Sequence, residues 1–176
     1  MFSTPSINLS QFHLEPGMVV ADLGCGIGAY TFEIAKRVGS TGKVFALDVQ
    51  KVLIEKVANE CKREGIHNVS ALWDDLDDAD GIGLQDQSID RAVIANALFQ
   101  IDDIQKFAVE VKRILKNKGQ ALVVDWSESF GGIGPTPQAI ITKERALDAF
   151  KKVGFVFIKD VNAGDHHYGF VIQCNT

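Results

Sequence analysis

Residues 19–29 decide the fold, and they read VVADLGCGIGA. The run starts with five residues typical of a buried strand and continues into a turn with three glycines, after which a helical pattern begins. Glycine adopts backbone conformations that other residues avoid, so the turn can be tight and its main-chain atoms stay open to a ligand. A strand, a glycine turn and a helix in this order predict the first unit of an α/β fold with a parallel sheet.

The same alternation of short apolar runs and amphipathic segments recurs along the chain. We expect strands at Val19–Leu23, Val44–Leu47, Val69–Trp73, Ala92–Ala95, Ala121–Val124, Phe155–Ile158 and Tyr168–Ile172. We expect helices at Ala29–Val38, Lys51–Glu64, Asp102–Lys118 (with Asp102 as its cap) and Thr142–Val153. A glycine follows each expected helix, and glycine favours helix termination because it accepts the left-handed conformation.

The end of the chain departs from this alternation. The segments Phe155–Val161 and His167–Cys174 are joined by a short turn at Asn162–Asp165, which leaves no room for a helix, so they must pair antiparallel. We therefore predict an α/β fold, a doubly wound, Rossmann-like, mainly parallel seven-stranded sheet that ends in an antiparallel hairpin. No linker or repeat interrupts residues 1–176, which favours a single domain.

Composition limits the classes of partner. The chain has 176 residues, of which 46% are hydrophobic and 23% charged, and its formal net charge is −5. It lacks the runs of Lys and Arg that bind nucleic acid, a signal-peptide pattern and an apolar run long enough to span a membrane. Three cysteines without paired spacing, and His166 and His167 side by side on an expected strand, give no metal site. We expect a cytoplasmic protein with neither nucleic acid nor membrane as its partner.

The ligand of an open α/β sheet lies beyond the carboxyl ends of the parallel strands. Gly24, Gly26 and Gly28 follow the first expected strand, and Asp22 stands just before them. The spacing also matches G-x-G-x-x-A, a dinucleotide-binding pattern, so an NAD-dependent oxidoreductase stays an alternative. Asp22, however, attracts a cation and repels a pyrophosphate, which favours a ligand that carries sulfonium and ammonium groups.

Further candidates follow the next two strands. Asp48 ends the second strand, where a carboxylate accepts hydrogen bonds from both ribose hydroxyls of an adenosine ligand. Val49 is placed to pack on the adenine ring, although ordinary packing of the helix on the sheet explains it equally well. Asp74 follows the third strand and is a candidate acceptor for the adenine amine, although the neighbouring Asp77 and Asp78 also fit a solvated acidic loop.

Asn96 follows the fourth strand, beside the place where the reacting group must lie. Its amide offers a donor and an acceptor without charge, so we expect Asn96 to contact both cofactor and substrate. Phe99 and Trp126 are further candidates for the substrate pocket. No residue stands out as a general base, and the catalytic residue remains unidentified from the sequence.

Together these motifs resemble the class I S-adenosylmethionine-dependent methyltransferases, in particular their small-molecule branch, which includes the quinone-biosynthesis methyltransferases. The matching stretches are Val20–Gly28, Ala46–Val49, Gly65–Val69 with Asp74, Asp86–Asp90 and Ile114–Gly119. The resemblance implies S-adenosylmethionine as cofactor, with its methionine part on Asp22 and the glycine loop. It also implies that Asp48 holds the ribose and that Asp74 holds the adenine.

Two features bear on the methyl acceptor. The segment Asn96–Phe99 reads NALF and departs from the Asn-Pro-Pro-aromatic signature of methyltransferases that modify amino groups of nucleic acids, which favours a small-molecule acceptor. The loop Glu128–Ile141 is short where many relatives carry a lid, so the acceptor pocket is open or is completed by a partner or a homodimer. A non-catalytic partner subunit that keeps the fold is therefore a second alternative to a methyltransferase.

Overall fold

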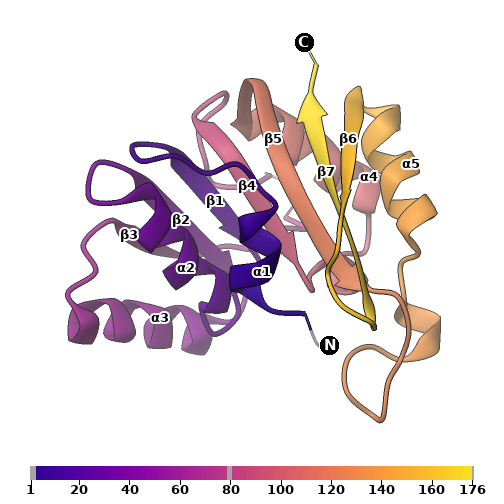
Figure 1. Cartoon of the computed structure of the whole chain (residues 1–176), viewed down its shortest axis with the longest axis horizontal. Coiled ribbons are helices and arrows are strands. Elements are labelled where there is room, and N and C mark those ends of the chain that lie inside the picture. Colours follow the sequence, from indigo (N-terminus) through magenta and orange to yellow (C-terminus); the bar gives the residue numbers. More distant parts are fainter. Residues whose placement is uncertain (1–2, 79–80, 176) are drawn as a thin grey trace.

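The computed structural model describes residues 3–78 and 81–175. It contains one sheet with the strand order β3-β2-β1-β4-β5-β7-β6 (Figure 1). The strands are β1 (Val19–Leu23), β2 (Lys43–Asp48), β3 (Val69–Trp73), β4 (Ile89–Ala95), β5 (Leu115–Trp126), β6 (Phe155–Val161) and β7 (His167–Cys174). The first five strands pair in parallel, and β7 runs antiparallel to both β5 and β6. The predicted fold class, including the terminal hairpin, is confirmed.

Helices cover both faces of the sheet. They are α1 (Pro5–Ser10), α2 (Ala29–Val38), α3 (Lys51–Glu64), α4 (Ile104–Ile114) and α5 (Lys143–Lys152), with short 3₁₀ turns at Leu98–Gln100 and Pro137–Ala139. Neighbouring residues of one strand serve opposite faces: Val20 packs in the cluster that contains residues of α1 and α2, whereas Ala21 packs with those of α4 and α5. Strands buried on both faces explain why their sequences are continuously apolar.

Helix α4 is shorter than predicted. The sequence predicted a helix over Asp102–Lys118 that ends at Gly119, but the chain is already in β5 at Leu115, which pairs with Ile89. The left-handed residue of this segment is Lys118, with a φ of 61°. The cap is Asp103, whose Oδ1 accepts hydrogen bonds from the amides of Gln105 and Lys106 at 3.0 Å. Apolar spacing continued past the true helix end because β5 is buried as well.

Helix α1 was not predicted. Its residues Asn8 and Leu9 are buried against the rest of the molecule. The guanidinium group of Arg37 in α2 donates to the carbonyl oxygen of Ser6 at 3.0 Å. Gln11, directly after α1, exchanges two hydrogen bonds with the main chain of Asn162 in the β6–β7 turn, at 2.9 and 3.0 Å. These contacts fix α1 across the edge of the sheet at which the parallel strands end (Figure 1).

The strand order reverses between β1 and β4. From β1 the chain moves outward through β2 to β3 and then crosses to β4 on the other side of β1. In open α/β sheets this switch point opens a crevice at the carboxyl ends of the two strands. No helix within residues 3–78 and 81–175 is long and apolar enough to cross a membrane.

Candidate functional site

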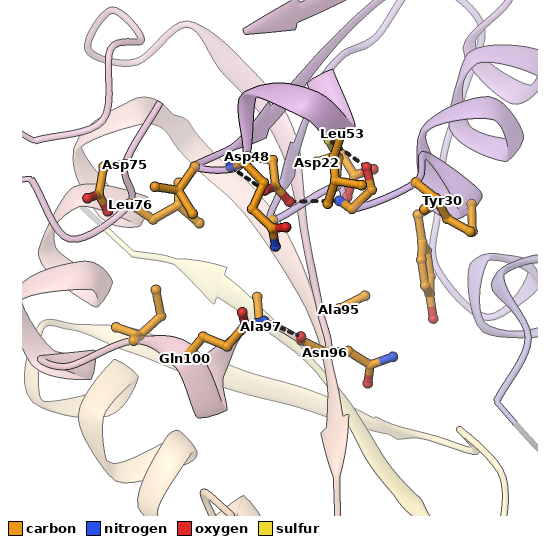
Figure 2. A pocket seen from close by; sticks show the side chains of 18 of the residues that line it. Asp22, Tyr30, Asp48, Leu53, Asp75, Leu76, Ala95, Asn96, Ala97 and Gln100 are labelled. Atoms are coloured by element: carbon orange, nitrogen blue, oxygen red, sulfur yellow. Dashed lines mark hydrogen bonds between the residues drawn. The ribbon is translucent and has the colours of Figure 1, made fainter. Parts of the chain in front are cut away.

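A cavity of about 300 Å³ lies at this switch point. Its walls come from the glycine loop after β1, the end of β2, the segment after β3 and the segment after β4. Figure 2 shows Asp22 and Asp48 on one side of the cavity and Asn96 and Gln100 on the other. The volume lies at the lower end of the range for small-molecule and cofactor sites.

The glycine loop depends on glycine at two positions. Gly24 has a φ of 81°, and a Cβ there would lie 2.8 Å from the Cβ of Ala97, in the segment after β4. Gly28 has a φ of 86°, and a Cβ there would lie 2.8 Å from the ring of Phe32. Gly24 and Gly26 line the cavity, whereas Gly28, the N-cap residue of α2, does not. The glycines therefore allow close packing of the loop as well as access to it.

Asp48 is held by the main chain. Its side chain is 8% exposed and lines the cavity. Oδ2 accepts a hydrogen bond from the amide of Gly26 at 2.9 Å, and Oδ1 accepts one from the amide of Gln50 at 2.8 Å. A carboxylate has about four acceptor positions, so the two oxygens keep capacity for a ligand diol. Val49, the next residue, also lines the cavity and is exposed.

Asp22 is buried, with 1% of its surface exposed, and it also lines the cavity. Its Oδ2 accepts a hydrogen bond from the hydroxyl of Thr31 at 2.6 Å. Burial raises the pKa of Asp22 to about 7, and the nearby charge of Asp48 adds to the rise, against the hydrogen bond from Thr31. Among the described residues that line the cavity there is no Lys, Arg or His. An opposite charge beside such a pair of carboxylates favours their ionised forms, so the site suits a cationic ligand.

The structure does not bring Asp74 into the cavity. Its Oδ2 accepts a hydrogen bond from the amide of Gly83 at 2.7 Å, and the side chain serves the loop that leads to β4. The next residues, Asp75 and Leu76, line the cavity instead (Figure 2). The sequence favoured Asp74 because it is the first polar residue after β3, and a run of several aspartates gave no means to choose among them.

Asn96 lines the cavity as predicted. It adopts a left-handed conformation with a φ of 56°, and its amide donates to the carbonyl oxygen of Val124 at 2.8 Å. Its side-chain Oδ1 is buried and has no hydrogen-bond partner among the described residues. A buried acceptor of this kind is normally satisfied, so Asn96 has capacity for a ligand donor.

Phe99 and Trp126 do not line the cavity. Phe99 is half-buried on the 3₁₀ turn after β4. The indole ring of Trp126 is buried against the imidazole of His167, with ring centroids 4.2 Å apart, and Gly134 lies over it. Phe99 follows β4 and Trp126 is the last residue of β5, but the sequence does not indicate how far each side chain is turned from the cavity.

Two functional candidates were missed. Tyr30 lines the cavity, and its hydroxyl accepts a hydrogen bond from Asn8 of α1 at 2.6 Å, a contact that depends on the unpredicted helix. Asp125, at the end of β5, is 2% exposed and accepts hydrogen bonds from the amides of Leu98 and Trp126. The signal in the sequence was a carboxylate at the end of a continuous apolar run. A carboxylate at such a buried position needs hydrogen-bond partners.

Comparison with known proteins adds to this geometry. Residues 14–161 match the family described as methyltransferase domain. The chain belongs to this methyltransferase family. The resemblance that the sequence motifs indicated is thereby confirmed.

Two curated relatives of this methyltransferase domain have names that refer to quinones. The ubiquinone/menaquinone biosynthesis C-methyltransferase of Hydrogenovibrio crunogenus is 30% identical over 115 residues, which cover 65% of this chain and 44% of that protein. The 2-phytyl-1,4-naphtoquinone methyltransferase of Trichormus variabilis is 29% identical over 112 residues, which cover 64% of this chain and 48% of that protein. The chain therefore spans about half the length of these relatives.

The similarity to a solved structure is more extensive. A SAM-dependent methyltransferase from Aquifex aeolicus superimposes with a TM-score of 0.89 at 26% sequence identity, and the match covers 98% of this chain and 90% of that one. The methyltransferase domain thus has, over nearly its whole length, the architecture of a protein of similar size.

Proposed function

We propose that the protein is an S-adenosylmethionine-dependent methyltransferase that acts on a small molecule. The observation that carries the proposal is the pair Asp22 and Asp48 in a cavity whose described lining has no basic side chain. Two carboxylates in a low-dielectric site favour a cationic nucleoside and oppose a pyrophosphate. The membership of the methyltransferase family supports this choice over an NAD-dependent oxidoreductase.

The residues present fit the cofactor. The glycine loop and Asp22 would hold its methionine part, since a carboxylate there complements the ammonium and sulfonium charges. Asp48 would accept hydrogen bonds from both ribose hydroxyls, with Gly26 and Gln50 fixing its orientation. Val49, Asp75 and Leu76 line the cavity. Val49 and Leu76 would lie against the adenine, and Asp75 would make the contact to the adenine amine that the sequence suggested for Asp74.

When bound, the cofactor supplies a methyl group already activated by its sulfonium sulfur. The task of the chain is then to align the acceptor with that methyl group and to exclude water, and alignment alone contributes much of the acceleration. Tyr30 and Asn96 line the cavity from α2 and from the end of β4, and both carry polar groups suited to orient an acceptor. A general base is needed only for an acceptor that is protonated at the working pH.

We infer a small, uncharged acceptor such as a quinone precursor. The names of the two curated relatives point to quinone substrates, and a cavity whose described lining residues include no basic side chain does not suit a phosphorylated one. We also propose a cytoplasmic location, and a homodimer as one way in which the acceptor pocket is completed. The net charge of −5 supports the view that nucleic acid is not the acceptor.

The test is transfer of radiolabelled methyl from S-adenosylmethionine to metabolites of a cell extract, with purified protein. Label in a small, extractable acceptor supports the proposal. Tight cofactor binding without transfer to any acceptor class would instead indicate a non-catalytic partner subunit. Binding of NADH with no binding of S-adenosylmethionine in equilibrium dialysis would restore the oxidoreductase alternative.

A further inference from the structure

Asp125 has an unusual place in the structure. It lies at the end of β5 on the same face as Ala121 and Val123, which pack with α4 and α5, and it does not line the cavity. Its exposed fraction is 2%, and its strand neighbour across the sheet is Tyr168 of β7. A buried carboxylate lowers stability unless it is well hydrogen-bonded, so its presence here requires an explanation.

The carboxylate joins two segments of the main chain. Oδ2 accepts a hydrogen bond from the amide of Leu98 at 2.8 Å, and Oδ1 accepts one from the amide of Trp126 at 2.7 Å. The amides of Ala97 and Phe99 also favour its charged form. Burial nevertheless raises the pKa of Asp125 to about 6. Three successive amides of the segment after β4 therefore interact with one carboxyl group.

That segment forms one wall of the cavity. Asn96, at its start, holds a left-handed conformation that costs a non-glycine residue energy. Ala97 packs where a Cβ on Gly24 would lie, so the segment touches the glycine loop directly. Ala97, Gln100 and Ile101 all line the cavity (Figure 2). The chain turns sharply here and contains a strained residue. Its main-chain amides that have no partner within the turn need a hydrogen-bond acceptor held in a fixed position.

We propose that Asp125 is a positioning residue that holds the segment 96–101 in the conformation required for cofactor binding and methyl transfer. It acts through the amides of Leu98 and its neighbours and does not itself contact a ligand. The inference rests on the proposed function, because it takes the cavity to be the S-adenosylmethionine site.

The test compares Asp125→Asn with Asp90→Asn. Asp125→Asn keeps the volume of the side chain, but its amide nitrogen cannot accept, so one of the two facing N–H groups loses its acceptor. Asp90 is a matched control, because its carboxylate also accepts a main-chain amide, that of Val19 at 2.8 Å, together with Lys116, at the opposite end of β4. Should Asp125→Asn fail to fold, Asp125→Ser removes the buried charge, keeps one oxygen and is measured in its place.

Two quantities are measured for each variant. Calorimetry gives the dissociation constant of S-adenosylmethionine, which we expect to rise about tenfold or more in Asp125→Asn and to stay within about twofold in Asp90→Asn. Amide hydrogen exchange gives local protection, which we expect to fall at Leu98 and to be kept at Val93 in the interior of β4. Faster exchange at Leu98 combined with weaker binding supports the positioning role.

The inference is overturned if Asp125→Asn keeps either the protection of Leu98 or the cofactor affinity, or if Asp90→Asn loses as much affinity. A wild-type protein that does not bind S-adenosylmethionine would instead contradict the proposed function. That result would also remove the role of Asp125 in cofactor binding, even if the amide of Leu98 proved to depend on its carboxylate.

Discussion

Asp22 is a carboxyl group buried in the folded protein, and burial disfavours its charged form. The pKa of Asp22 is about 7 and lies above the ordinary value of 3.8. The folded protein therefore binds the proton of this carboxyl group more tightly than the unfolded chain does. The stability that the folded protein gains from binding this proton is fully present below about pH 4 and is lost as the pH rises through about 7.

We therefore expect Asp22→Asn to raise the free energy of unfolding at pH 8, by on the order of 2–4 kcal/mol, and to do so much less at pH 5. Asparagine keeps an oxygen for the hydroxyl of Thr31 but carries no charge. Affinity for S-adenosylmethionine should fall in the same variant, and wild-type affinity should rise with pH through about 7. Denaturant titration and calorimetry at both pH values check these outcomes. A variant less stable than the wild type at pH 8 would refute the electrostatic account of this site.

Asp48 should contribute more to affinity than to stability. Asp48→Ala would remove the two charge-assisted hydrogen bonds that we propose between Asp48 and the ribose, so we expect cofactor affinity to fall about 100-fold. Asp148→Ala is the control, because Asp148 is exposed on α5, pairs with Lys152 on the same helix and does not line the cavity. Calorimetry that finds the same affinity in Asp48→Ala and wild type would show that the ribose assignment is wrong.

The sequence favoured Asp74 at the site, whereas the structure has Asp75 in the cavity lining. Asp75 lines the cavity, whereas the carboxylate of Asp74 is bonded to the amide of Gly83. We expect Asp75→Ala to weaken cofactor binding several-fold, by about 1 kcal/mol for one hydrogen bond, and Asp74→Ala mainly to lower stability. Equal binding by Asp75→Ala and wild type, with a clear loss in Asp74→Ala, would return the adenine contact to Asp74.

The predicted site residues that line the cavity are those whose position follows from the end of a strand. They are Asp22, Gly24, Gly26, Asp48, Val49 and Asn96. Asp74 and Phe99 also follow strand ends and Trp126 ends β5, yet none of the three lines the cavity. The sequence indicates which edge of the sheet a residue reaches, but the rotation of the chain beyond that edge depends on tertiary contacts.

The contact between the glycine loop and the segment after β4 couples two elements. Gly24→Ala would place a Cβ 2.8 Å from that of Ala97, at a φ of 81° that alanine disfavours. We expect a loss of about 2 kcal/mol in stability and weaker cofactor binding, because the loop and the opposite wall are forced apart.

Gly65→Ala is the matched control for this prediction. Gly65 also has a positive φ, of 66°, in the left-handed region, but it follows α3 and nothing lies within 4 Å of an added Cβ. We expect a cost of about 1 kcal/mol and unchanged affinity. Thermal denaturation and calorimetry of both variants test the difference. Identical losses would mean that backbone conformation alone, and not the close contact with Ala97, explains the effect.

The predicted boundaries of helices and strands were wrong where two buried elements adjoin. Helix α4 passes into β5 without a polar break, so apolar spacing predicted helix as far as Lys118. Helix α1 is too short to show a clear helical period, and its burial against α2 and the β6–β7 turn is a tertiary effect. Three of the four glycines expected after helices follow them closely, and Gly119 does not, because Lys118 makes the left-handed turn there.

The fold class of the sheet and its terminal antiparallel hairpin were the most predictable features. Parallel strands need helical crossovers, and a turn of a few residues permits only an antiparallel pair, so β6 and β7 had one arrangement available. The same topology places the carboxyl ends of β1 and β4 side by side at the switch point, where the cavity lies. The methyl acceptor is not specified at this level, because the fold carries many activities on the same crevice.

The central claim is that this crevice holds S-adenosylmethionine with Asp48 on its ribose and Asp22 beside its charged groups. A crystal structure of the protein soaked with S-adenosylmethionine at pH 8 tests it most directly. We predict cofactor density along the glycine loop, with both ribose hydroxyls within hydrogen-bond distance of the Asp48 carboxylate. An empty crevice under saturating cofactor, or a nucleoside bound at another place on the molecule, would contradict the account.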